Sequence, residues 1–115
     1  MLSKSYPIFS KLLPIELSTI TFPVKRVFFI QDKSGAVRGN HAHYTQNQFL
    51  VCLSGEVWVE LLTDEIRSIH LYPGDSCYIK PMVWDTVRFV QDSSILVFCD
   101  TEYDPSDYVT NKCLM

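Results

Sequence analysis

Two of the three histidines, His41 and His43, are separated by a single alanine, and Arg38 lies shortly before the first. Alternate residues of an extended strand point to the same face, so the two imidazoles should project side by side into one space. Imidazole changes its charge near neutral pH and also binds transition metals. The pair is therefore suited to transferring protons or to holding a metal, and Arg38 adds a cation suited to an anionic ligand.

The length of 115 residues and the apolar fraction of 47% are those of an ordinary globular protein, which predicts one domain over 1–115 with one site. No apolar run approaches the roughly 20 residues that cross a bilayer, and the N-terminus lacks the zones of a signal peptide. We therefore expect a cytoplasmic protein without a membrane partner.

The net charge of −3 and the scattered basic residues argue against nucleic acid as a partner. The four cysteines lack metal-type or redox-type spacing, so we expect them to be buried.

Short β-rich runs separated by turn residues fill the chain from Lys25 onward, and they are the elements that must position the histidines. The expected strands span 25–30, 47–53, 56–62, 66–71, 76–79, 86–90 and 94–99. Turn residues such as those at 73–75 lie between them. Seven short strands at this spacing predict an all-β barrel or sandwich.

Two runs, 49–53 and 95–99, are apolar at every position, so both of their faces should be covered by a second sheet or by a partner subunit. We expect the protein to be a homodimer for this reason. Residues 1–23 are expected to form an N-terminal arm with a short strand near 12–17. The tail over 104–115 should contain a helical turn, because Asp104 can serve as its N-cap and a proline follows.

The segment from Gly35 to Gly55 resembles the first cupin motif, G-x5-H-x-H-x3or4-E-x6-G, except that Gln48 replaces the glutamate. Residues 73–75 and 81–85 resemble the second cupin motif, and Asp85 stands where that motif has a metal-binding histidine. The resemblance implies a double-stranded β-helix, which is a jelly-roll barrel. This fold agrees with the number of β-rich runs.

Within the cupins, the chain is similar to the sugar nucleotide 3,4-ketoisomerases. The shared features follow in order along most of the chain: Lys25-Arg26-Val27-Phe28-Phe29, Arg38-Gly39-x-His41-Ala42-His43, Gln48 to Gly55, Pro81-x-Val83-Trp84, and Tyr103-Asp104-x-x-Asp107-Tyr108. The resemblance implies an isomerase that converts dTDP-4-keto-6-deoxyglucose to the 3-keto sugar, for the deoxyamino sugars of O-antigen or S-layer glycans. The family's tyrosine near Phe28, its histidine at Asp85 and its arginine near Thr110 are replaced here.

The choice between a metal and proton transfer depends on the residues around the histidine pair. A catalytic metal needs three or four ligands, whereas His41 and His43 supply two. Gln48 is a poor ligand, and Asp85 would contribute only if its strand aims it inward, so we expect no metal and no other cofactor. Isomerisation needs a base at C3 and an acid or base at the two oxygens. The resemblance implies that His41 is the carbon base and His43 serves the oxygens, with the reverse assignment open.

Six further residues are candidates for binding the dTDP-linked keto sugar: Arg26, Arg38, Phe28, Gln48, Tyr78 and Trp84. The two arginines would clamp the diphosphate, because guanidinium groups offer paired donors to phosphate oxygens. The three aromatic rings would stack on thymine or sugar, although aromatic residues of β-barrels also fill cores. Two alternative functions stay open: a metal-dependent cupin oxygenase or isomerase, and a sugar nucleotide binding module without catalysis.

Overall fold

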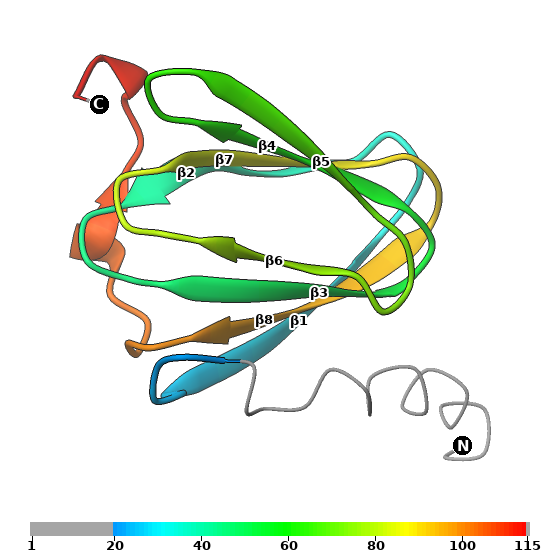
Figure 1. The fold of residues 1–115 in the computed structure, drawn as a ribbon, viewed down its shortest axis with the longest axis horizontal. Coiled ribbons are helices and arrows are strands. Elements are labelled where there is room, and N and C mark those ends of the chain that lie inside the picture. Colours follow the sequence, from blue (N-terminus) through cyan, green and yellow to red (C-terminus); the bar gives the residue numbers. More distant parts are fainter. Residues whose placement is uncertain (1–19, 115) are drawn as a thin grey trace.

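The computed structural model describes residues 20–114, which form two antiparallel β-sheets that face each other (Figure 1). One sheet has the order β1 (Arg26–Asp32), β8 (Ser93–Cys99), β3 (Gln48–Ser54) and β6 (Ser76–Ile79). The other has the order β5 (Ile66–Leu71), β4 (Val57–Leu62), β7 (Trp84–Phe89), β2 (Val37–His43) and β9 (Tyr108–Val109). Successive strands mostly alternate between the two sheets, so the predicted all-β jelly-roll fold is confirmed. Within the described part, no helix is long and apolar enough to span a membrane.

All seven strands expected from the sequence are present, with ends that differ by at most two residues. The apolar runs did not reveal two more strands, β2 and β9. Strand β2 is polar and contains Gly39 and Asn40, so apolar periodicity cannot detect it. It is held by pairing with β7 and β9 and is irregular, because its register shifts between Gly39 and His41. The φ angles of 75° at Gly39 and 60° at Asn40 accommodate this bulge.

The inner faces of both sheets form one apolar core. Alternation along β4 places Val57 and Val59 inside and leaves Trp58 38% exposed, as the sequence pattern predicts. The other strands of both sheets add fully buried side chains to this core, among them Leu50, Cys52, Leu71, Ile79, Val87, Phe89, Ile95 and Val97. This packing fixes which residues of each strand can face the space between the sheets.

Strand β3 is covered on both faces, as its uniformly apolar sequence predicts, whereas Leu96 and Phe98 on the outer face of β8 are only partly buried. The inner side chains of both strands belong to the main core. Their outer side chains form a second cluster, in which Ile20 and Phe22 pack over the sheet. The members of this outer cluster on the sheet are Phe49, Val51, Leu53, Tyr78, Leu96 and Phe98. The strand expected near 12–17 lies outside the described residues.

Three of the four cysteines are buried, as expected, and all four are free thiols. Burial raises the pKa of Cys77 to about 12, so this thiol stays protonated and behaves as a small apolar group. Cys113 is exposed, contrary to the expectation. It lies in a short 3-10 turn, η3 (Lys112–Leu114), beyond the last strand, where no sheet covers it.

The helical turn expected in the tail is present as a 3-10 turn, η2 (Pro105–Asp107). The side chain of Asp104 caps it by accepting a hydrogen bond from the backbone N–H of Ser106 at 2.9 Å. Pro105 occupies the first position of the turn. A backbone N–H at this position would have no partner within the turn, so proline is tolerated there. This turn presents Asp107 to the loop that follows β2, since the Tyr44 N–H donates to the Asp107 carbonyl at 2.8 Å.

Gly55→Ala should destabilise the protein more than Gly35→Ala, although both glycines have positive φ angles of 81° and 89°. A Cβ at Gly55 would lie 2.5 Å from the Asp92 carbonyl oxygen and would also collide with Ser93, whereas a Cβ at Gly35 would meet nothing within 4 Å. We expect the free energy of unfolding to fall by about 1 kcal/mol for G35A and by at least about 3 kcal/mol for G55A. Urea denaturation followed by circular dichroism measures both, and equal losses would contradict the role of the Gly55 contact.

Candidate active site

A cavity of about 210 Å³ lies between the two sheets. Alternate residues of a strand point to the same face, which determines the residues that line the cavity. On β1, Arg26 and Phe28 face inward, whereas Val27 between them points outward and is 48% exposed. Apolar side chains of β3, β7 and β8 form much of the wall. The polar residues that line the cavity are Arg26, Arg38, His41, Gln48, Asp85 and Tyr108. Four of the six substrate-binding candidates, together with His41, therefore meet in one cavity.

The rings of His41 and His43 lie side by side, with centroids 4.9 Å apart and planes at 82°. This confirms that the two imidazoles share a face of β2. The Tyr108 ring packs against both, at 5.0 Å from His41 and 4.4 Å from His43. The two histidines differ in access: the side chain of His41 is 21% exposed and lines the cavity, whereas that of His43 is 3% exposed and lies behind it.

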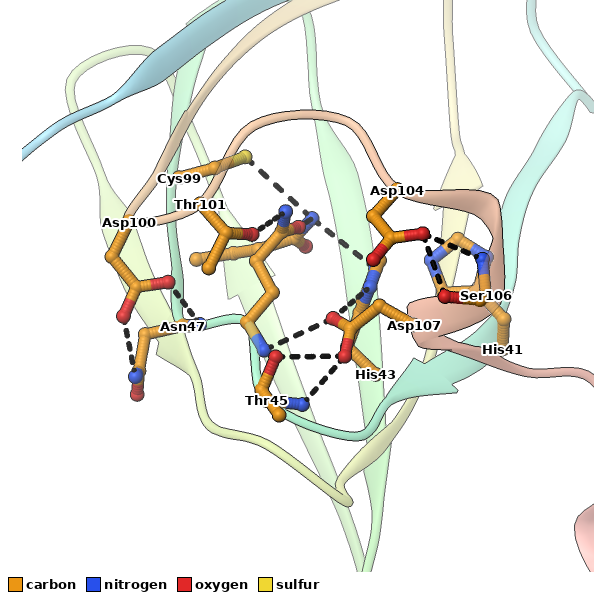
Figure 2. Close-up of polar contacts among 12 residues, drawn as sticks. His41, His43, Thr45, Asn47, Cys99, Asp100, Thr101, Asp104, Ser106 and Asp107 are labelled. Carbon is orange, nitrogen blue, oxygen red and sulfur yellow. Dashed lines mark hydrogen bonds and ion pairs between the residues drawn. The ribbon is translucent and has the colours of Figure 1, made fainter.

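His43 is held by a polar network that joins β2 to the C-terminal segment (Figure 2). Its Nδ1 lies 3.5 Å from Oδ2 of Asp107, and its Nε2 lies 3.5 Å from the Gln48 amide nitrogen. Asp107 accepts hydrogen bonds from the Thr45 N–H at 2.9 Å and the Thr45 hydroxyl at 2.7 Å. Because the Gln48 amide nitrogen can only donate, this arrangement favours the tautomer that carries its proton on Nδ1, toward Asp107.

The dry interior favours the uncharged form of each ionisable group in the histidine pair. Burial, and secondly the neighbouring His43, lower the pKa of His41 to about 4. Burial also lowers the pKa of His43, and the nearby Asp107 carboxylate opposes that shift. At neutral pH His41 is therefore an unprotonated imidazole that faces the cavity and can accept a proton.

Asp85 lies directly across from His41, its register partner on the neighbouring strand β7. Its Oδ2 is 3.8 Å from Nε2 of His41. The carboxyl is buried and points into the cavity, and burial raises its pKa to about 7. The sequence had suggested Asp85 only as a substitute for a metal ligand. Its inward register places it instead as an ionisable neighbour of His41.

The two candidate arginines reach the cavity in different states. The Arg26 guanidinium lies over the Phe28 ring at 4.5 Å and near the Tyr103 ring at 5.2 Å. Its Nη1 is buried and finds no hydrogen-bond partner within residues 20–114. Arg38 is half exposed and already pairs with Asp32, because its Nε and Nη2 both lie 2.9 Å from the carboxylate. Arg26 therefore offers free donors inside the cavity, whereas Arg38 would have to share its donors with Asp32.

Tyr78 and Trp84 do not line the cavity, so their proposed stacking on the ligand needs correction. Tyr78 faces the outer side of β6, where its ring packs 4.8 Å from that of Phe49 and its hydroxyl accepts a hydrogen bond from the Thr21 N–H. Trp84 is buried in a separate cluster, and its Nε1 donates to Asn40 at 3.3 Å. Both precede an inward-facing residue, so alternation turns them outward. The sequence alone did not predict which residues of these two strands face inward.

Sequence reasoning missed the contact between Asp107 and the histidine pair. In the structure the Asp107 carboxylate reaches His43, with its Oδ2 3.5 Å from Nδ1 of the ring. Asp107 and Tyr108 lie far from the histidines along the chain, so no local sequence pattern predicts this contact. As to a metal, the described part of the chain contains no group of three or more His, Cys, Asp or Glu side chains that could hold one. The absence of a metal stays a prediction.

A family model described as FdtA, WxcM-like, C-terminal, matches residues 9–113. The chain is also 38% identical over 99 residues to the TDP-4-oxo-6-deoxy-alpha-D-glucose-3,4-oxoisomerase of Aneurinibacillus thermoaerophilus, in a match that covers 82% of this chain and 70% of the relative. Both matches extend over most of the sequence, and the family model includes all the strands that line the cavity.

Solved structures agree with the sequence comparison. QdtA, a sugar 3,4-ketoisomerase from Thermoanaerobacterium thermosaccharolyticum in complex with TDP, matches with a TM-score of 0.79 and 33% identity over 85% of this chain and 74% of its own. A 3,4-ketoisomerase from Helicobacter canadensis matches with a TM-score of 0.79 and 27% identity over 86% of this chain and 77% of its own. The resemblance in the sequence is thus confirmed, and the chain belongs to the FdtA family of WxcM-like, C-terminal domains, with 3,4-ketoisomerases among its relatives.

Proposed function

We propose that this protein is an isomerase that converts dTDP-4-keto-6-deoxyglucose to its 3-keto isomer. The observation that carries the proposal is the imidazole of His41, which faces a cavity that also presents the unpaired Nη1 of Arg26. Relatives at up to 38% identity are 3,4-oxoisomerases or 3,4-ketoisomerases of TDP-linked sugars, which supports the same activity.

The chemistry requires a base and an acid on either side of one carbon–carbon bond. The hydrogen on C3 is acidic because the C4 carbonyl lies next to it, so a neutral imidazole such as His41 can remove it. The resulting enediol accepts a proton at C4, and the oxygen on C3 becomes the new carbonyl. The half-buried His41 lies in a largely apolar cavity, where charge that develops on the sugar oxygens is strongly affected by nearby donors.

The diphosphate of the substrate would bind the two arginines of the cavity. The buried Arg26 Nη1 lacks a partner among the described residues, and a phosphate oxygen would satisfy it. Arg38 lies at the rim, half exposed, and could bind the second phosphate in exchange for Asp32. Phe28 and Gln48 line the same cavity and would contact the sugar. We propose that the nucleotide is dTDP, that no metal takes part, and that the reaction occurs in the cytoplasm, where it would supply deoxyamino sugar synthesis.

Incubation with dTDP-4-keto-6-deoxyglucose in deuterated water should yield the 3-keto sugar with deuterium at the reacting carbons, whether or not a chelator is present. His41→Asn should lower the rate at least about 100-fold, because it removes the carbon base. His70→Asn is a matched control that should leave the rate unchanged, since His70 stacks on Trp58, away from the cavity. Mass spectrometry and NMR measure the products.

Three results of this experiment would contradict the proposal. Tight binding of the sugar nucleotide without exchange would indicate a binding module. Activity that is lost with chelator and restored by a transition metal would indicate a metal-dependent cupin. An H41N variant that exchanges as fast as the wild type would remove His41 from its proposed role.

We also propose that the protein is a homodimer that pairs through the outer face of the sheet containing β1. Val27 and Phe29 point outward from β1 and are 48% and 54% exposed. They lie in register with Phe98 and Leu96 of β8, so four apolar side chains form one continuous surface. An apolar strip of this kind on the first strand of a sheet is unfavourable in water unless another surface covers it.

Phe29→Asp should convert the dimer to a monomer, because it places an unpaired charge in the middle of this apolar strip. Gln31→Asp is the matched control: it adds the same charge to the next outward position of β1, which is already polar and pairs with Ser94. Sedimentation velocity distinguishes the two species. A wild-type protein that sediments as a monomer, or a Q31D variant that dissociates like F29D, would contradict the proposed surface.

A further inference from the structure

Asp85 is a buried acid that the pairing of β2 with β7 aims into the active-site cavity. It lies opposite His41 on one neighbouring strand and opposite Leu61 on the other. Its side chain is 4% exposed, yet it contributes to the cavity wall. His41 and Asp85 are therefore two proton-transfer groups that reach the same cavity from adjacent strands.

The Asp85 carboxyl has room but no partner. Within the described residues, its Oδ2 forms no hydrogen bond, and Nε2 of His41 at 3.8 Å is too far to serve as one. Gly39 makes the room: a Cβ at this position would collide with the Asp85 carboxyl and lie 3.1 Å from its backbone oxygen. A buried polar atom without a partner is unfavourable, so a group supplied by a ligand would stabilise it.

The surroundings of Asp85 favour its protonated form well above the pH at which an exposed aspartate ionises. Burial raises its pKa to about 7, and no cation is close enough to reverse that shift. Arg38 is paired with Asp32 at 2.9 Å, and the facing strand β4 contributes the apolar Leu61. The other ionisable groups around the cavity and the Asp85 carboxyl are His41 on β2, Arg26 on β1, Cys77 on β6 and Tyr108 on β9.

His43 is less well placed for work on the substrate oxygens. Its side chain is 3% exposed and does not line the cavity. Asp107 and Gln48 face its two ring nitrogens. The His41 and Tyr108 rings pack against His43, and Gln48 lies between its Nε2 and the cavity. The role predicted for His43 at the sugar oxygens stays a prediction, and Asp85 is better placed in the cavity for that role.

On the basis of the proposed function, we propose that Asp85 is the catalytic acid and base for the two sugar oxygens, while His41 moves the proton between the two carbons. His41 takes the C3 proton, the C3–H electrons form the C3=C4 bond, and the former carbonyl O4 takes the proton of the Asp85 carboxyl. The Asp85 carboxylate then removes the proton from O3, whose electrons form the C3 carbonyl. The double-bond electrons take the proton of His41 at C4, which restores both side chains.

Asp85→Asn tests this role, because the amide keeps the shape and cannot transfer the proton. We expect isomerisation to fall at least about 100-fold while deuterium exchange at C3 falls less, so that the ratio of exchange to isomerisation rises. In the wild type, kcat/KM should decrease above about pH 7 as Asp85 ionises. D85N should lack this decrease. Asp100→Asn is the control that should retain it, because Asp100 pairs with Asn47 and does not line the cavity.

A measurement without substrate tests the same acid independently. The folded protein binds the Asp85 proton more tightly than the unfolded chain does, so its stability should fall as the pH rises from about 4 to about 7. D85N has no such proton to lose. We therefore compare the melting temperature of D85N with that of the wild type at two pH values. The difference, D85N minus wild type, should be at least about 5 °C larger at pH 8 than at pH 5. A difference that does not change with pH would overturn the proposal, since Asp85 would then be ionised throughout.

The remaining outcomes separate this inference from the proposed function. A wild-type protein that isomerises the sugar, together with a D85N variant of similar rate and unchanged pH profile, overturns the role of Asp85 alone. A wild-type protein that neither exchanges nor isomerises overturns the proposed function and, with it, the role of Asp85. Loss of activity in D85N with an unchanged ratio of exchange to isomerisation also overturns it, because the carbon and oxygen steps would not be divided as proposed.

Discussion

The antiparallel pairing of β2 with β7 is the interaction on which the site depends. Strand β2 carries little apolar area, so its position is set by hydrogen bonds to its neighbours rather than by burial. The bulge after Gly39 resets its register and places His41 opposite Asp85. A shift of the pairing by one residue would turn the histidines away from the cavity, which makes this register the geometric condition for everything else.

One physical cause gives the two cavity groups opposite chemical character. Desolvation disfavours charge on either group, so it lowers the pKa of His41 and raises that of Asp85. The result is a neutral base next to a neutral acid, the reverse of an ion pair. The apolar walls supplied by β3, β7 and β8 thus contribute to the chemistry as well as to stability, because they exclude the water that would restore ordinary ionisation.

The sequence predicted the strands with strong periodicity and the histidine pair, because local alternation determines both. It did not predict that Tyr78 and Trp84 face outward, since parity on those strands depends on pairing partners rather than on composition. It also missed the contact of Asp107 with His43, because the two hydrogen-bonded segments, at Thr45 and Asp107, are 62 residues apart. Arg26, Phe28 and Gln48 line the cavity, and they had been proposed from the family resemblance rather than from strand periodicity.

The Asp107 network has a consequence for biosynthesis. Ribosomes release a chain from its N-terminus onward, so β1 to β8 emerge before the turn that carries Asp107. Until then the loop at Thr45 and Gln46 lacks the carboxylate that its N–H groups bind, and His43 lacks its anionic neighbour. A nascent chain can therefore close most of its sheets before the loop after β2 and His43 gain their contacts with Asp107, which ties the completion of the site to a segment translated after β1 to β8.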